Sequence, residues 1–303
     1  MVARASTPAA STEHRMRRWT REWLRLAALP LVPDRAERIG RLYDLVGTGN
    51  LFGEDSLYIN LGYWRHHPAT LDEASVELAR LLGREAFLRA DDVVLDVGCG
   101  YGEQDLLWAR EFGCAEIIGV NVAPEQVRAA NARVAASGLG DRIRYVQASA
   151  MELPRDDASV TKVLALESPF HFPSQRRFFA ESLRVLEPGG RLVTADIVPR
   201  RGVLNQLDRE GYRDALRETG FQDVRVYSIR RDVYRPLSVY LRTRLRDPDM
   251  REVNPLLRMM FSTGGVRAWS VWLDYVIAVA TKGDGGQETR VARGVSDSRS
   301  RRS

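Results

Sequence analysis

Short apolar runs alternate with amphipathic stretches through the middle of this chain. Strands are expected at residues 93–97, 117–120, 143–147, 160–166, 191–195, 224–228 and 275–280, most of them rich in Val, Ile and Leu, although 143–147 and 224–228 also contain polar residues. Their length and composition are typical of strands buried in a sheet. Helical spacing of apolar residues is found between them, at 103–112, 124–137, 174–186 and 204–219. This alternation predicts an α/β fold, with a mostly parallel sheet covered by helices on both faces.

The residues before the first strand predict a helical region that spans 13–90. An amphipathic helix is expected at 13–29, because its large apolar side chains share one face. Residues 70–73 have the sequence of a capping box and open a second helix, which we expect to end near Leu88. Such a region would pack on the domain or fold over its site as a lid. Contact of the first helix with a membrane surface stays open as the alternative.

The rest of the chain divides into one large domain and two flanking segments. Residues 91–282 hold every predicted strand, and 232–272 form a helical cap insertion before the last one. Residues 1–12 and 283–303 are small or polar and predict disorder.

Composition argues against several classes of function. The chain has 303 residues, of which 44% are hydrophobic, so it can bury a large core. No window approaches the roughly 18 consecutive apolar residues of a membrane span, and the N-terminus lacks the apolar core of a signal peptide. We therefore expect a cytoplasmic protein. The net charge of +5 is spread along the chain, which argues against nucleic-acid binding. Homo-oligomer formation stays open.

Disulfide and metal chemistry are not expected either. Cys99 and Cys114 are too few for a disulfide framework or a zinc cluster. Histidines and carboxylates do not cluster at the spacing of metal ligands. We predict that no metal is bound.

The strongest motif is a glycine-rich loop after the first predicted strand. Asp96 lies near the end of the strand, and Gly98, Gly100 and Gly102 follow at alternate positions before a helix. A strand, a glycine turn and a helix bring backbone N–H groups against a ligand, and a Cβ would keep that ligand away. A dinucleotide fingerprint would need a glycine where Glu103 stands. The observed pattern is similar to the first motif of class I S-adenosylmethionine (SAM)-dependent methyltransferases. This similarity implies that Asp96, Gly98, Gly100 and Gly102 bind SAM.

Residues at the ends of the next two strands extend this candidate site, because such sheets bind ligands at the carboxyl ends of their strands. Asn121 stands where a Rossmann-like site usually has an acidic residue that binds ribose hydroxyls, and its carbonyl oxygen can accept one such bond. Ser149 stands where many methyltransferases have an Asp that binds the adenine amino group, and its neighbour Ala150 is counted with it among the cofactor-binding residues. An ordinary loop position is the alternative interpretation of Asn121 and of Ser149.

The segment after the fourth strand carries the candidate chemistry. A hydroxyl is a poor nucleophile until a neighbouring base takes its proton. His171 is the one histidine inside the predicted domain, and an ordinary imidazole pKa of about 6.5 makes it a base at neutral pH. We predict that His171 is the general base and that Glu167 orients its ring or the substrate hydroxyl. Asp196, at the end of the fifth strand, is the second candidate base, and a buried structural histidine is the alternative.

Taken in chain order, these motifs resemble the class I SAM-dependent small-molecule methyltransferases of secondary metabolism. The resemblance covers about residues 42–230 and is carried by residues 58–64, 96–102, 119–126, 166–171 and 186–190. It is most specific for the erythromycin-pathway sugar O-methyltransferases and the microcystin-type O-methyltransferases. It implies SAM as cofactor, a Rossmann-like seven-stranded sheet with an antiparallel last strand, and an N-terminal lid.

The resemblance also implies further cofactor contacts. Tyr63 would close on SAM from the lid, and an aromatic face suits a sulfonium cation. Gln126 and Glu167 would join the cofactor-binding residues.

Three functions remain open. The first is methylation of a hydroxyl on a natural product such as a polyketide or macrolide sugar, with the aromatic residues of 232–272 forming an apolar acceptor pocket. The second keeps SAM but methylates a carbon of an isoprenoid or polyketide, or modifies a lipid. The third is a non-catalytic protein with the same fold, against which the glycine loop and the candidate base argue. Nucleic-acid bases are not expected as acceptors, because residues 166–169 lack an Asn/Asp-Pro-Pro-aromatic motif.

Overall fold

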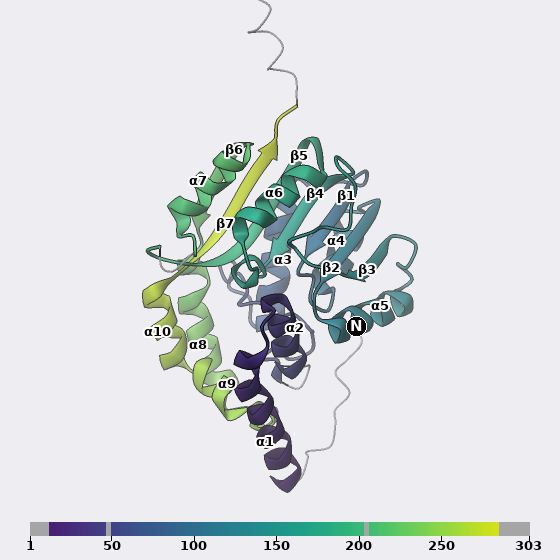
Figure 1. The fold of residues 1–303 in the computed structure, drawn as a ribbon. Coiled ribbons are helices and arrows are strands. Elements are labelled where there is room, and N and C mark those ends of the chain that lie inside the picture. Colours follow the sequence, from purple (N-terminus) through teal and green to yellow (C-terminus); the bar gives the residue numbers. More distant parts are fainter. Residues whose placement is uncertain (1–11, 47–49, 203–205, 285–303) are drawn as a thin grey trace, which may run out of the picture.

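The apolar runs form seven strands of one sheet (Figure 1). The computed structural model describes residues 12–46, 50–202 and 206–284. The segments predicted to be disordered lie outside these ranges, except for Thr12, Gly283 and Asp284. The strands are β1 (Val93–Val97), β2 (Glu116–Asn121), β3 (Ile143–Gln147), β4 (Val160–Leu166), β5 (Leu186–Pro199), β6 (Phe221–Ser228) and β7 (Leu273–Lys282). β1 to β4 begin and end within one residue of their predicted bounds.

The strand order places a ligand crevice between β1 and β4. The order is β3-β2-β1-β4-β5-β7-β6, and β7 is antiparallel to both neighbours while the other pairs are parallel. The predicted Rossmann-like sheet with an antiparallel last strand is therefore confirmed. The strand order reverses between β1 and β4, and doubly wound sheets bind ligands at the carboxyl ends of such strands.

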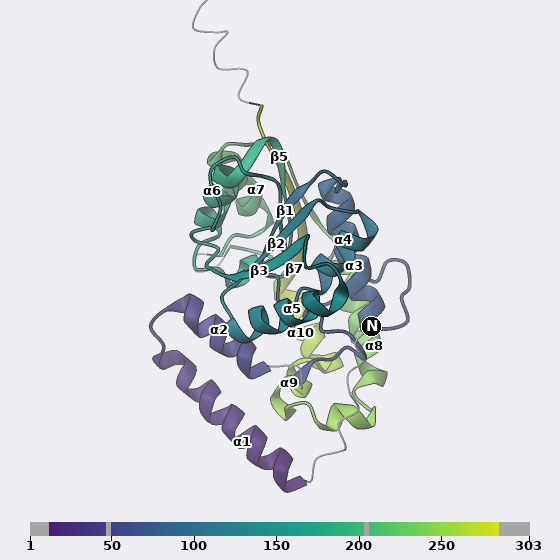
Figure 2. The same ribbon diagram turned by 90° about the vertical axis from the view of Figure 1, so that its right-hand side faces the viewer.

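Helices cover both faces of the sheet (Figure 2). One face carries α3 (Leu71–Ala86), α4 (Glu103–Glu111) and α5 (Pro124–Ser137), and the other carries α6 (Gln175–Val185) and α7 (Arg209–Thr219). Leu78 and Trp108 are fully buried on the first face, and Phe178 and Tyr212 on the second. Full burial of one large apolar side chain contributes about 2 kcal/mol to the stability of the fold. Both helix layers therefore stabilise the sheet that carries the site at its carboxyl edge.

Local signals set two helix starts. Thr70 caps α3, because its hydroxyl accepts from the Glu73 backbone N (3.1 Å) while the Glu73 carboxylate accepts from the Ala69 N (2.7 Å). This is the predicted capping box. α7 begins later than expected from 204–219, because the Asp208 carboxylate accepts from the Gly211 N (2.9 Å) and caps the helix there.

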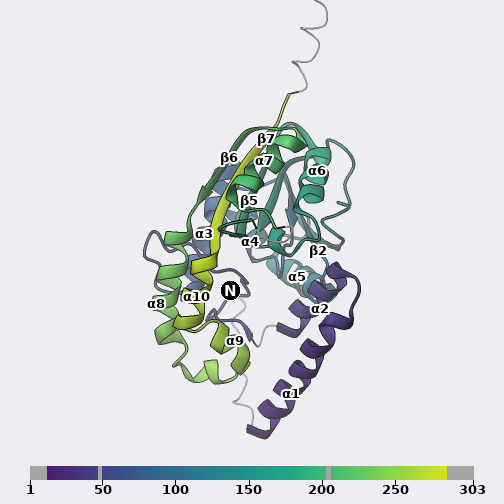
Figure 3. The same ribbon diagram turned by 60° about the vertical axis from the view of Figure 1, so that its left-hand side comes forward.

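Two helical groups extend beyond the carboxyl edge of the sheet (Figure 3). The N-terminal arm, residues 12–46, contains α1 (Thr12–Ala28), η1 (Leu29–Leu31) and α2 (Arg35–Val46). The cap lies between β6 and β7 and contains η4 (Arg230–Asp232), α8 (Tyr234–Arg244), η5 (Pro248–Arg251), α9 (Pro255–Met260) and α10 (Thr263–Trp272). The helix predicted at 13–29 is confirmed as α1, whereas α2 was not predicted.

The arm reaches from the sheet to the cap. On α1, Arg15 pairs with Glu252 (3.0 Å), and the Arg18 guanidinium donates to the Glu252 backbone oxygen. Glu22 accepts from Asn254 Nδ2 (2.7 Å). The described part of the chain contains no helix with both the length and the apolar character that a membrane span needs.

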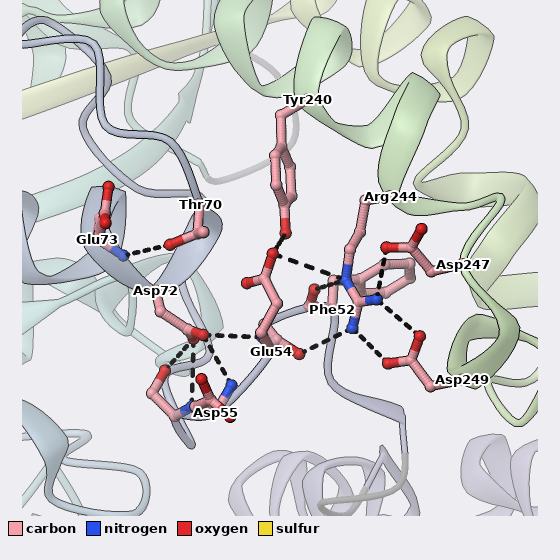
Figure 4. A network of polar contacts seen from close by, with 12 residues as sticks. Phe52, Glu54, Asp55, Thr70, Asp72, Glu73, Tyr240, Arg244, Asp247 and Asp249 are labelled. Atoms are coloured by element: carbon pink, nitrogen blue, oxygen red, sulfur yellow. Dashed lines mark hydrogen bonds and ion pairs between the residues drawn. The ribbon is translucent and has the colours of Figure 1, made fainter. Parts of the chain in front are cut away.

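Arg244 on α8 fastens the cap to the segment before α3 (Figure 4). Its side chain is 4% exposed, donates to the backbone oxygens of Phe52 (3.1 Å) and Gly53 (3.3 Å), and pairs with Asp249 (2.6 Å). One turn earlier, the Tyr240 hydroxyl donates to the Glu54 carboxylate. Buried carbonyl groups need donors, so this guanidinium fixes the path of residues 52–54 against the cap.

Candidate active site

A cavity lies at the carboxyl ends of β1, β2 and β4, in the expected crevice. Among its apolar walls are Val97, Val120 and Leu166 of the sheet, Ile39 and Tyr43 of the arm, and Ile59. Of the predicted site residues, the lining includes Gly98, Gly100, Asn121, Gln126, Ser149, Ala150, Glu167 and His171. Apolar walls with a few polar groups are typical of small-molecule sites.

Each of the three glycine positions in the loop excludes a larger residue for a different reason. Their φ angles are +86° at Gly98, +57° at Gly100 and +73° at Gly102. A Cβ at Gly98 would overlap the Ser168 side chain, and one at Gly102 would overlap the Tyr145 hydroxyl. A Cβ at Gly100 would meet no protein atom within 4 Å, and Gly100 lines the cavity. Gly100 is therefore where the backbone lies open to a ligand.

Asp96 lies beneath the loop and does not line the cavity. It is fully buried, and its Oδ2 accepts from Gln104 Nε2 (2.7 Å), which also donates to the Cys99 oxygen (3.0 Å). Burial raises the pKa of Asp96 and of its neighbour Asp105, which is fully buried too. The structure thus places Asp96 where it shapes the turn, whereas the sequence analysis placed it against the cofactor.

Asn121 and Gln126 form a polar pair on the cavity wall. Asn121 Nδ2 donates to Gln126 Oε1 (2.7 Å), and Asn121 Oδ1 accepts from the Val122 N (2.8 Å). Gln126 Nε2 is buried and has no hydrogen-bond partner among the described residues. A buried donor in this position is available to a ligand.

Ser149 and Ala150 line the cavity from a tight turn after β3. The Ser149 hydroxyl accepts from the Met151 N (3.1 Å), and the Ser149 backbone oxygen accepts from the Glu152 N (3.2 Å). These bonds hold the turn at the cavity wall.

Glu167 is clamped between the N-terminal segment and β7. Its φ of +48° is uncommon for a residue with a Cβ. Its Oε1 accepts from the Leu61 N (2.7 Å) and from the Tyr275 hydroxyl (2.6 Å). Burial raises the pKa of Glu167 to about 7, although both hydrogen bonds act in the opposite direction. A cation bound in the cavity would favour the ionised carboxylate.

His171 ends η3 (Pro169–His171), the short turn after β4. The Tyr43 hydroxyl lies 2.6 Å from His171 Nε2, and the two ring centroids are 5.2 Å apart in an edge contact. The Phe170 ring packs on the imidazole at 3.8 Å. From the sequence we expected Glu167 to orient this ring or the substrate hydroxyl. The structure instead places Tyr43, from the unpredicted helix α2, at its Nε2.

Asp196 is fully buried and does not line the cavity. Its Oδ1 accepts from the backbone N of Phe170 (3.0 Å) and Ile197 (2.9 Å), and its Oδ2 accepts from Gln175 Nε2 (2.9 Å). Burial raises the pKa of Asp196 to about 8 against these hydrogen bonds. The carboxyl group therefore holds the turn that presents His171.

Two sets of aromatic residues lie elsewhere than expected. Tyr63 is 5% exposed within the core and does not line the cavity, whereas Ile59 of the same segment does. In the cap, Tyr234 belongs to the core, and Trp269 packs edge-on against Phe261. The direction of the side chains in the irregular segment 58–64 and in the short helices of 232–272 depends on tertiary packing, which the spacing of these residues does not reveal.

The described residues offer no evident metal site. They contain no group of three or more His, Cys, Asp or Glu side chains placed to hold an ion. Metal independence stays a prediction, which turnover in excess chelator would test.

Comparisons with known proteins connect this geometry to sequence relatives. Residues 95–194 match the family described as "Methyltransferase domain". The chain is 34% identical over 270 residues to erythromycin 3''-O-methyltransferase of Saccharopolyspora erythraea, covering 79% of this chain and 88% of that protein. It is 35% identical over 203 residues to 27-O-demethylrifamycin SV methyltransferase of Amycolatopsis mediterranei, covering 61% of this chain and 73% of that protein.

Solved structures share the fold. The [4+2]-cyclase SpnF matches with a TM-score of 0.71 and 24% identity, covering 82% of this chain and 97% of that one. Geranyl diphosphate C-methyltransferase from Streptomyces coelicolor A3(2) matches with a TM-score of 0.66 and 20% identity, covering 83% and 98%.

Proposed function

The chain belongs to the SAM-dependent methyltransferase family, and we propose that it transfers the methyl group of SAM to a hydroxyl of a natural product. One observation supports this above all: the open loop at Gly100, the carboxyl group of Glu167 and the imidazole of His171 line one cavity. The similarity to erythromycin 3''-O-methyltransferase, over 88% of that protein, favours oxygen as the methylated atom and a macrolide or related polyketide as the acceptor.

The residues of the cavity fit SAM. The backbone at Gly100 leaves room for a ligand, and Gln126 Nε2 is a buried donor without a partner in the described ranges. Asn121 and Ser149 add polar atoms, and Glu167 supplies a negative charge beside the cavity. When bound, SAM supplies a methyl group on a positively charged sulfur. These five residues would hold it.

His171 would take the proton of the acceptor hydroxyl as that oxygen becomes the nucleophile. Most of the acceleration would come from holding the oxygen and the methyl carbon about 3 Å apart and in line. Asp196 would act through the turn that it holds: its bond to the Phe170 N (3.0 Å) fixes the residue next to His171.

The proposal is tested by methyl transfer to two acceptors, 27-O-demethylrifamycin SV and erythromycin that lacks its 3''-O-methyl group. We expect an O-methylated product from at least one. His171→Ala should lower turnover by roughly 10²–10⁴-fold, the usual contribution of a general base, while calorimetry shows unchanged SAM affinity.

Asp196→Asn is the matched variant for the rival base. An amide can still accept from the Phe170 N, so we expect a smaller loss of turnover than in His171→Ala. If Asp196→Asn abolishes turnover while His171→Ala stays active, Asp196 is the base and His171 is structural. A wild-type chain that binds no SAM contradicts the proposal as a whole.

A further inference from the structure

We propose that Tyr43 relays the acceptor proton to His171, an inference that rests on the proposed function of the cavity. The relay makes the N-terminal arm part of the catalytic machinery as well as its cover. It assigns a direct chemical role to a residue on α2, a helix separated by more than a hundred residues from the turn that carries the base.

The geometry at His171 brings Tyr43 to one of its ring nitrogens. The Tyr43 hydroxyl lies 2.6 Å from Nε2. In a neutral imidazole, one nitrogen carries the proton and the other has a single lone pair in the ring plane. Burial, and then the Glu167 carboxylate, raise the pKa of Tyr43, so its hydroxyl stays protonated. The relay uses the imidazole tautomer with its proton on Nδ1, in which Nε2 accepts from that hydroxyl. While this bond exists, an acceptor hydroxyl cannot use the same lone pair.

The N-terminal arm holds Tyr43 in this place. α2 packs tightly on the loop after β2, where a Cβ on Gly40 would lie 3.3 Å from the Val122 oxygen. Ile39, one turn before Tyr43, also lines the cavity. At its other end the arm is tied to the cap through the contacts of α1 with Glu252.

Closure of the arm determines the path that the acceptor proton can take. A lid that excludes water has to stay closed during the transfer. With the arm closed, Nε2 is occupied by Tyr43, and both residues line the cavity. A proton from the acceptor can then reach Nε2 only by passing through the Tyr43 hydroxyl. A phenol group can do this, because it donates one hydrogen bond and accepts another.

Two protons and one methyl group move in the relay. The acceptor O–H bond breaks and its proton moves to the Tyr43 oxygen, while the proton of Tyr43 moves to Nε2. The freed electron pair on the acceptor oxygen forms the new bond to the methyl carbon, and the electrons of the carbon–sulfur bond remain on sulfur. A methyl ether, a neutral thioether and an imidazolium result, and the imidazolium later returns its proton through Tyr43 to solvent.

Tyr43→Phe tests the relay, because it keeps the ring and its edge contact with His171 but removes the hydroxyl. In single turnovers with whichever of the two acceptors the wild type methylates, we expect the rate to fall roughly 10²–10³-fold, within the range for a lost acid–base group. SAM affinity should stay unchanged, because Ile39 and the ring still cover the cavity. Tyr227→Phe is the control: that hydroxyl donates to Glu85 (2.7 Å) and does not line the cavity. Its rate should match the wild type.

A second readout separates a relay from a merely structural contact. Two protons move together in the relay, so the wild-type rate in mixtures of H2O and D2O should depend on the deuterium fraction along a curve. A straight line means that one proton moves, and it overturns the relay. An unchanged or faster Tyr43→Phe also overturns it, because the hydroxyl would then only block Nε2. Both results leave the proposed function intact. A wild type that methylates no hydroxyl would contradict the relay and the proposed function together.

Discussion

At the scale of single residues, the glycines of the loop can be told apart by substitution. Gly100→Ala puts a Cβ into the cavity without touching protein, so SAM affinity should fall by at least tenfold, roughly 1.4 kcal/mol. Its left-handed backbone adds a loss of about 1 kcal/mol in the free energy of unfolding. Calorimetry with SAM and urea unfolding measure the two effects.

Gly102→Ala is the matched comparison. Its Cβ would overlap the Tyr145 hydroxyl, so the free energy of unfolding should fall by about 3 kcal/mol. A Gly100→Ala variant that binds SAM as tightly as the wild type would show that the ligand does not lie against this backbone.

Glu167 should make SAM binding depend on pH. Its pKa of about 7 in the folded protein leaves it largely protonated in mild acid. A bound cation favours the carboxylate, so binding in acid releases a proton. Affinity should therefore rise with pH by at most tenfold per unit up to about pH 7, and level off above it. Glu167→Gln should flatten this dependence. Calorimetry in buffers of different ionisation enthalpy measures how many protons are released on binding. If the wild type releases no proton in mild acid, Glu167 does not ionise when SAM binds.

At the scale of elements, the attachment of the cap depends on Arg244. Arg244→Ala leaves the Phe52 and Gly53 carbonyl groups without their donor, so the free energy of unfolding should fall by about 2–4 kcal/mol. Asp249→Ala should cost less than about 1 kcal/mol, because that carboxylate is 56% exposed. Urea unfolding compares the variants. Equal losses would mean that the ion pair, and not the carbonyl bonds, holds the cap.

The elements differ in how local their signals are. β1, β2 and β4 were predicted because each is a mostly apolar run, and β3 because Ile143, Tyr145 and Val146 follow the helix stop at Gly138. α2 was not, although Ile39, Leu42 and Tyr43 have helical spacing. Its burial depends on a contact with the loop at Val122, more than 80 residues away in the sequence, and a short amphipathic stretch does not show such a partner.

The same reasoning explains which site residues could be found. Parallel strands bring their carboxyl ends together, so Asn121, Ser149 and Glu167 were expected at one cavity and line it. Tyr43 was missed, and Tyr63 lies in the core. Neither residue ends a strand of the sheet, so the direction of its side chain depends on tertiary packing.

At the scale of the whole molecule, the fold does not choose the reaction. The [4+2]-cyclase SpnF shares it with a TM-score of 0.71, so one fold can serve different chemistries. The reaction proposed for this chain is supported instead by its cavity and by relatives of similar sequence. The arm and the cap meet beyond the carboxyl edge of the sheet (Figure 3), and this arrangement can close the site around a cofactor and an acceptor.

The position of the transferred methyl group decides whether the chain methylates oxygen. The full chain is incubated with SAM labelled with carbon-13 at the methyl group and with 27-O-demethylrifamycin SV or erythromycin lacking its 3''-O-methyl group. NMR of the product should show the label in a methyl group bonded to oxygen, and the signal should be lost in His171→Ala. A label on carbon, or no transfer by a wild type that binds SAM, would contradict the account.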